Sequence, residues 1–240
     1  MDISKFFSLM KNVDDWNIVS RNFNTSFNKN DLKNQTDYIN EEINETLSAI
    51  KDNDIVELVD GLADVFVTLS YKLKIAVHNI YLNDEQNSCY DDLLNWVIEN
   101  NFQETKIESM NDVEIYLHEL KKNNLNNSSS IYNDLIVLYY MMKFVGELFS
   151  IDMIKAIELV MQSNWSKFPL YVDDVTCARE CKILNETYSN VVSKIVTYND
   201  KQYVIYRDNL GNGKVRKPST YHKPDFSSLE IQSVFQFYNQ

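Results

Sequence analysis

The sequence predicts an all-α fold with a small β-containing segment near its C-terminal end. Helix-breaking residues are rare, because the 240 residues include only four glycines and three prolines, and every proline lies beyond residue 168. In the first two thirds of the chain, apolar residues recur at the three- and four-residue intervals that place them on one helical face. The scarcity of glycine also excludes a Gly-rich phosphate-binding loop of the P-loop or Rossmann type.

The apolar pattern divides the body of the chain into five helices. Their predicted ranges are 1–24, 28–53, 54–82, 131–149 and 150–164. Asp54 is the expected N-cap of the third helix, and Ser150 or Asp152 of the last. The third helix is nearly all apolar apart from its acids, which predicts a buried position in a helical bundle. The aromatic stripe of the fourth helix, "VLYYMMKFVGELF", is expected to form core or a subunit interface.

Two stretches depart from this pattern. Residues 83–130 are polar, with two short amphipathic helices expected near 90–100 and 111–122 and an Asn/Ser-rich linker at the end, and they read as an insertion. Residues 191–217 alternate β-branched and aromatic residues around "YNDKQ" and "NLGNG", which predicts a short hairpin or meander. We therefore predict a helical core over residues 1–168 and a C-terminal extension over residues 169–240.

Composition restricts the function. The formal net charge of -12 disfavours a broad nucleic-acid surface and is compatible with binding of divalent cations. Three cysteines are too few, and of the wrong parity, for a disulfide framework, which indicates a reducing compartment. No secretory signal is recognisable, and no segment reaches the about 18 uninterrupted apolar residues of a membrane span. A cytoplasmic protein without membrane or nucleic-acid partners is expected.

The acids of the second and third predicted helices form the most informative pattern. They are arranged as EExxE and ExxD, with one further acid a turn later: Glu41, Glu42, Glu45, Glu57, Asp60 and Asp64. If the two helices pack antiparallel, four or five carboxylates meet across the interface. Two like charges at about 4 Å cost roughly 4 kcal/mol at an effective dielectric near 20, so such a cluster needs protons or hard cations. Carboxylate ligands suit Mg²⁺ or Mn²⁺.

The simpler interpretation is that these acids are solvated side chains of an acidic protein. For a single ExxE pair this would be the better explanation. Here, however, the second set lies within "VELVDGLADVFVTL", where acids interrupt an otherwise buried helical face. That placement favours a metal site.

Three blocks of the sequence carry a family resemblance. "EEINE" followed by "ELVDGLAD" resembles the signature of the all-α nucleoside triphosphate pyrophosphohydrolases, the MazG-like superfamily, which includes dimeric dUTPases and phosphoribosyl-ATP pyrophosphohydrolase. "SIDMIKAIELVMQSNWSKF" and "GKVRKPSTYHKPDF" are similar to the helix ending in "SNMSK" and to the tail of the phosphoribosyl-ATP pyrophosphohydrolase-like subgroup. The blocks cover residues 15–75 and 131–229. Trp165 replaces the subgroup's Met, and the link over residues 170–200 is longer than usual.

The resemblance implies Mg²⁺-dependent hydrolysis of (deoxy)nucleoside triphosphates to the monophosphate and pyrophosphate, for control of nucleotide pools, with Mn²⁺ as a possible substitute. It implies metal binding by Glu42, Glu45, Glu57 and Asp60, with Asp64 as an added or supporting acid. An alternative alignment makes Asp60 and Asp64 the second ligand pair. Glu41 and Glu42 are the expected catalytic acids, Glu41 as ligand or general base.

The other two blocks imply substrate-binding residues. Asn164 and Lys167 are expected to contact phosphate oxygens, and Lys217 and Tyr221 to close over the nucleotide from the tail. A homodimer or homotetramer is expected. The alternative is a non-catalytic binding or regulatory protein of the same fold that uses residues 83–130 as its docking surface, although the intact acids favour the enzyme.

Overall fold

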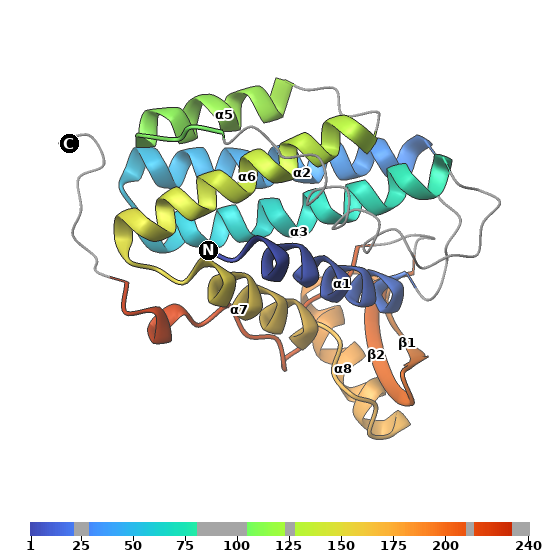
Figure 1. Cartoon of the computed structure of the whole chain (residues 1–240). Helices are drawn as coiled ribbons and strands as arrows, with labels where there is room; N and C mark the ends of the chain where they lie inside the picture. Colours follow the sequence, from blue (N-terminus) through green and yellow to red (C-terminus); the bar gives the residue numbers. More distant parts are fainter. Residues whose placement is uncertain (22–28, 81–104, 123–127, 210–213, 232–240) are drawn as a thin grey trace. The chain divides into compact units, whose positions relative to one another are not determined.

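The protein is described here by a computed structural model covering residues 1–21, 29–80, 105–122, 128–209 and 214–231 (Figure 1). The chain forms two compact units. Unit 1 comprises Met1–Asp14, Ser26–Val160 and Asp225–Gln240, and unit 2 comprises Asp15–Thr25 and Met161–Pro224. The predicted domain division after residue 168 remains a prediction.

Unit 1 is a helical bundle, as predicted. Its elements are α1 (Ile3–Ser20) and α7 (Met153–Ser166), both of which continue into unit 2, with α2 (Lys29–Asp52), α3 (Ile55–Ile80), α5 (Met110–Lys122), α6 (Ser128–Phe149) and the short 3₁₀ helix η1 (Phe226–Leu229). Helix α3 packs against α2 and α6, and α5 packs against α2 and α6 (Figure 1). The apolar stripe of α6 belongs to the core, because Leu135, Leu138 and Met141 are fully buried.

Local capping sets several helix ends. The Asp54 carboxylate accepts a hydrogen bond from the Glu57 backbone N–H at 3.1 Å, which confirms the predicted N-cap of α3. Asp152 accepts from the Lys155 N–H at 3.1 Å and is therefore the cap of α7. Helix α5 confirms the second amphipathic helix of the insertion, whereas the helix predicted at 90–100 lies outside the described residues. Helix α6 begins at Ser128, inside the predicted Asn/Ser linker.

Unit 2 contains the predicted hairpin. Strands β1 (Val191–Tyr198) and β2 (Lys201–Asp208) pair antiparallel through a two-residue turn in which Asn199 and Asp200 both have positive φ, of 46° and 59°. Positive φ at both turn residues matches the right-handed twist of the strands, and Asn and Asp tolerate it better than most residues.

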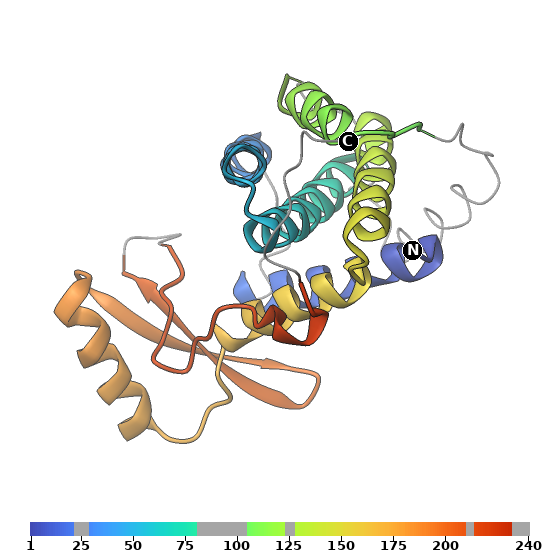
Figure 2. The same cartoon turned by 90° about the vertical axis from the view of Figure 1, so that its left-hand side faces the viewer.

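Both faces of this sheet are covered. Helix α8 (Asp174–Thr187) lies beside β1 (Figure 2) and buries Cys177 and Leu184 against Val204. A second cluster contains Val196 and Ile205 of the sheet with Val19 and Phe168, and the partly buried Trp16 and Trp165 pack against it. The sheet therefore forms the middle layer of a small α/β unit. None of the helices in the described part of the chain is long and apolar enough to cross a membrane.

Candidate active site

Helices α2 and α3 run antiparallel in a register fixed by three contacts. Near the start of α2, Gln35 Nε2 donates to the Thr68 carbonyl at 2.8 Å, and Lys72 Nζ donates to Thr36 Oγ1 at 2.7 Å. Further along α2, Thr46 lies against Gly61. Residue numbers thus rise along α2 as they fall along α3, which confirms the antiparallel packing assumed for the acids.

The two helices are in close contact where Thr46 meets Gly61. A Cβ atom placed on Gly61 would lie 2.4 Å from Thr46 Oγ1 and 3.2 Å from Thr46 Cα, so only glycine fits without movement of α2. Thr46 is fully buried, and its hydroxyl donates to the Glu42 carbonyl at 2.7 Å. The Thr46–Gly61 contact therefore joins the two helical segments that carry the predicted site acids, one on α2 and one on α3.

The register places most of these acids on one flank of the helix pair. On α2, Glu45 precedes Thr46 by one residue and Glu42 by four. On α3, Asp60 precedes Gly61 by one residue and Asp64 follows it by three. Residues separated by three or four positions share a helical flank, and equivalent flanks of two antiparallel helices lie on the same side.

The register also distinguishes between the two candidate ligand pairs of α3, Glu57 with Asp60 and Asp60 with Asp64. At about 1.5 Å per residue, Asp64 lies level with the Glu42–Glu45 turn and Asp60 lies close to the Thr46–Gly61 contact. Glu57 lies beyond the Thr46–Gly61 contact, toward the turn into α3, about 12 Å along the axis from Glu42. Asp64 is thus level with the Glu42–Glu45 turn and Asp60 lies about two residues from the level of Glu45, whereas Glu57 lies about five residues from it.

The six predicted site acids differ in their exposure to solvent. Glu42, Asp60 and Asp64 are half-buried, while Glu41, Glu45 and Glu57 are exposed. Among the described residues, no three Asp, Glu, His or Cys side chains converge closely enough to hold a metal ion. The donor set nevertheless fits Mg²⁺ or Mn²⁺ chemically, because every candidate is a carboxylate, the hard oxygen ligand that these ions prefer.

Unit 2 brings together the four predicted substrate-binding residues. Lys167 Nζ donates to Asn164 Oδ1 at 2.6 Å and lies 5.8 Å from the centre of the Tyr221 ring. Lys217 Nζ lies 4.5 Å from the centre of the same ring. Two ammonium groups thus lie over one aromatic side chain, and one of them is bonded to the Asn164 amide. We call these residues, Asn164, Lys167, Lys217 and Tyr221, the tyrosine cluster.

Local structure explains why these residues meet. Asn164 and Lys167 lie at the end of α7, where the Asn164 carbonyl accepts from Trp16 Nε1 at 2.8 Å. In the tail, the Tyr221 N–H donates to the Pro218 carbonyl at 2.9 Å, and this turn brings Lys217 back over the Tyr221 ring. Trp165 packs near Phe168 and Tyr203, so the residue that departs from the subgroup pattern is partly buried against the core of unit 2.

Charge is distributed unevenly between the units. Unit 1 carries 12 basic and 28 acidic residues, whereas unit 2 carries 11 basic and 7 acidic residues. Unit 1 therefore favours cations, and unit 2 favours anions.

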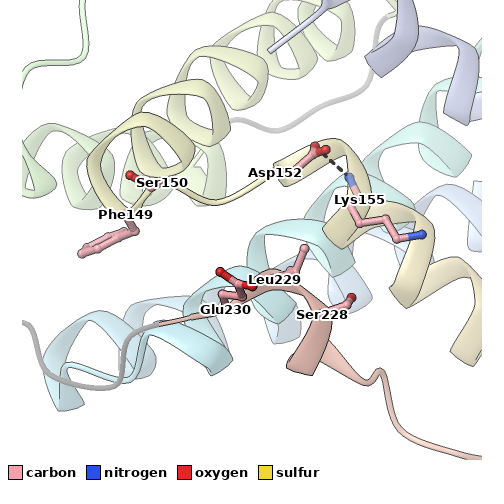
Figure 3. Close-up of a pocket in the computed structure, with 7 residues that line it drawn as sticks. All are labelled: Phe149, Ser150, Asp152, Lys155, Ser228, Leu229 and Glu230. Carbon is pink, nitrogen blue, oxygen red and sulfur yellow. Dashed lines mark hydrogen bonds between the residues drawn. The ribbon is translucent and has the colours of Figure 1, made fainter.

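A separate pocket of about 360 Å³ lies between the α6–α7 turn and η1, in unit 1 (Figure 3). It is lined by Phe149, Ser150, Asp152, Lys155, Ser228, Leu229 and Glu230. None of the predicted site residues lines it, and Asp152 there is engaged as the cap of α7.

Unit 1 thus combines a helical bundle with acids on two neighbouring antiparallel helices. Residues 19–84 match the family model described as phosphoribosyl-ATP pyrophosphohydrolase, which confirms the resemblance drawn from the acidic block; the "SNWSK" and tail blocks lie outside the matched residues. The matched segment includes all six predicted acids and ends where the predicted insertion begins. The chain matches no curated protein and no solved structure in the two other comparisons.

The family match supports a coarse assignment of activity. It supports a hydrolase that cleaves the pyrophosphate linkage of a nucleotide, in a family that generally depends on divalent metal ions.

Proposed function

We propose that the protein hydrolyses (deoxy)nucleoside triphosphates between the α and β phosphates, releasing the monophosphate and pyrophosphate, with Mg²⁺ as cofactor and Mn²⁺ as a possible substitute. Its biological role would be control of nucleotide pools in the cytoplasm. The observation that best supports this function is the register of α2 and α3, which aligns acids of the matched family segment on one flank beside the Thr46–Gly61 contact.

Four carboxylates are the proposed metal ligands: Glu42 and Glu45 on α2, and Asp60 and Asp64 on α3. The register favours Asp60 and Asp64 over the pair Glu57 and Asp60, because Glu57 lies further along the axis from Glu42 and Glu45 than Asp60 or Asp64 does. When bound, a divalent cation would neutralise phosphate charge and polarise the attacked phosphorus. Glu41, exposed beside this set, is the proposed base that accepts a proton from the attacking water.

The tyrosine cluster is the proposed phosphate-binding site. Ammonium and amide groups donate charge-assisted hydrogen bonds to phosphate oxygens. Two neighbouring ammonium groups repel each other in water, and an anion bound beside them relieves that repulsion. Assembly as a homodimer or homotetramer is also part of the proposal and can be measured by sedimentation.

The first experiment incubates the purified protein with Mg²⁺ and a panel of nucleoside and deoxynucleoside triphosphates, and measures monophosphate and pyrophosphate release. We expect release from one or a few nucleotides, abolished by EDTA and restored by excess Mg²⁺. Release of orthophosphate with the diphosphate would contradict the proposed cleavage position. No release from any nucleotide would favour the non-catalytic binding protein.

A matched set of isosteric variants tests the ligands. Asp64→Asn and Asp60→Asn should each lower kcat/KM by more than about 100-fold, since the loss of even outer partners of metal ligands costs about 10- to 100-fold. Glu57→Gln should change kcat/KM by less than about threefold, because Glu57 is not one of the four proposed ligands. If Glu57→Gln inactivates the enzyme and Asp64→Asn does not, the ligand pair is Glu57 and Asp60.

A further inference from the structure

Two serines of the "SNWSK" segment contact the tail. Ser163 is 3% exposed, and its hydroxyl donates to the His222 carbonyl at 2.8 Å. The His222 N–H donates to Ser166 Oγ at 3.2 Å, and the Ser166 hydroxyl donates to the Ser163 carbonyl at 2.6 Å. Both backbone polar groups of His222 are thus bonded by side chains more than fifty residues earlier in the chain. We call this arrangement the serine clasp.

The serine clasp acts at a defined point of the tail. The contact between Lys217 and Tyr221 follows from the local turn at Pro218, so it needs no long-range support. The contact between Lys167 and Tyr221 joins α7 to the tail, and it depends on the position of the residue next to Tyr221, which the clasp fixes. A second attachment holds the turn itself, since Ser219 donates from its N–H and its hydroxyl to the Glu180 carboxylate, both at 2.6 Å.

We propose that Ser163 and Ser166 are positioning residues that hold the tail on α7, so that the tyrosine cluster is assembled before an anionic phosphate chain binds. This inference rests on the proposed function, because it assigns the cluster to phosphate binding. An assembled site does not have to order the tail during binding, and the affinity for the phosphate chain is correspondingly higher. The tail is then a fixed wall of the site, whereas the sequence predicted a segment that closes over the nucleotide.

The test uses the full-length chain and Mg²⁺-free inorganic tripolyphosphate, with the dissociation constant measured by calorimetry. In the Ser163→Ala/Ser166→Ala double variant we expect the dissociation constant to rise about tenfold, the effect of losing hydrogen bonds that together favour the assembled site. Ser193→Ala, which makes the same change at an exposed serine of β1 in unit 2, should leave the dissociation constant unchanged.

A conservative variant separates positioning from general destabilisation. Ser166→Thr keeps the hydroxyl and should restore wild-type affinity relative to Ser166→Ala, with thermal unfolding monitored for every variant. If the double variant does not fold, the Ser166→Ala and Ser166→Thr pair decides the question. With a hydrolysed nucleotide, the serine variants should raise KM and leave kcat within about twofold, because the clasp acts on ground-state binding.

The outcomes distinguish this inference from the proposed function. Wild-type affinity in the double variant, or an absence of tripolyphosphate binding in the wild-type chain, overturns the serine clasp even if nucleotides are hydrolysed. If no nucleotide is hydrolysed but the double variant still loses tripolyphosphate affinity, the proposed function fails and the positioning role stands.

Discussion

Lys72 is a buried cation in the helical bundle. Its side chain is fully buried between α2 and α6, and its ammonium group donates to Thr36 Oγ1 at 2.7 Å. Burial lowers the pKa of Lys72 to about 8, and the nearby Asp134 carboxylate opposes part of that shift. At neutral pH the Lys72 ammonium group is charged although it is poorly solvated, which lowers the free energy of unfolding.

The pKa of Lys72 gives a signed prediction. Because it is lower in the folded than in the unfolded chain, the unfolded chain binds more protons between about pH 8 and pH 10.5, and stability rises with pH there. The free energy of unfolding should increase by on the order of 2 kcal/mol more in the wild type than in Lys72→Met between pH 7 and pH 9.5. Urea unfolding followed by circular dichroism measures both slopes. Equal slopes would show that Lys72 keeps an ordinary pKa.

Tyr221 is predicted to act through its ring and not through its hydroxyl, because two ammonium groups lie near the ring face. Tyr221→Phe should retain the affinity for nucleotide or tripolyphosphate. Tyr221→Leu should weaken it by about two- to fivefold, the loss expected for exposed cation–π contacts. Calorimetric titration of the two variants side by side is the measurement. Equal loss in both variants would instead assign the effect to the hydroxyl.

At the scale of elements, the α2–α3 pair depends on the contact between Gly61 and Thr46. Gly61→Ala would place a methyl group 2.4 Å from Thr46 Oγ1, and overpacking of this kind costs about 1–3 kcal/mol. The better helix propensity of alanine offsets about 1 kcal/mol of that cost. The separation of α2 and α3 also sets the distance between the acids of the proposed site.

A double-mutant cycle measures this contact. In a Thr46→Ala background the hydroxyl oxygen is gone, so Gly61→Ala should destabilise the protein less than it does in the wild type. The same cycle scored by Mn²⁺ affinity should show weaker binding in Gly61→Ala and partial recovery in the double variant. Additive effects on both stability and affinity would mean that the two positions do not interact.

At the scale of the whole molecule, the excess of acidic over basic residues in unit 1 makes it responsive to divalent cations. A ligand that binds only the folded chain stabilises it by about 2.7 kcal/mol at 100 times its dissociation constant, which corresponds to several degrees in Tm for a chain of this size. Mg²⁺ should therefore raise Tm more than NaCl of equal ionic strength. The Asp60→Asn/Asp64→Asn variant should lose that difference, and an equal effect of both salts on the wild type would indicate screening alone.

Local sequence signals predicted much of the fold. The Asp54 cap, helix α5 and the β1–β2 hairpin follow from short-range patterns, in which the capping residue, the apolar spacing and the "ND" turn act within a few residues. Helix α8 lies in the stretch over residues 170–200, which the sequence marked as a longer link than usual. Its apolar residues do not all lie on the buried face, because Val175 is 69% and Ile183 is 45% exposed while Cys177 and Leu184 are buried.

Part of the chemistry of the candidate site was anticipated from the sequence: the types and spacing of the acids indicated metal binding, and the family resemblance of the "SNWSK" and tail blocks implied phosphate binding. Which of them lie together was decided by tertiary structure. Asp64 lies level with Glu42 because of the α2–α3 register. The contact between Lys167 and Tyr221 depends on the two serines that bond to His222. Short-range interactions determine helices, caps and turns, whereas contacts between distant residues form only when the packed chain brings those residues together.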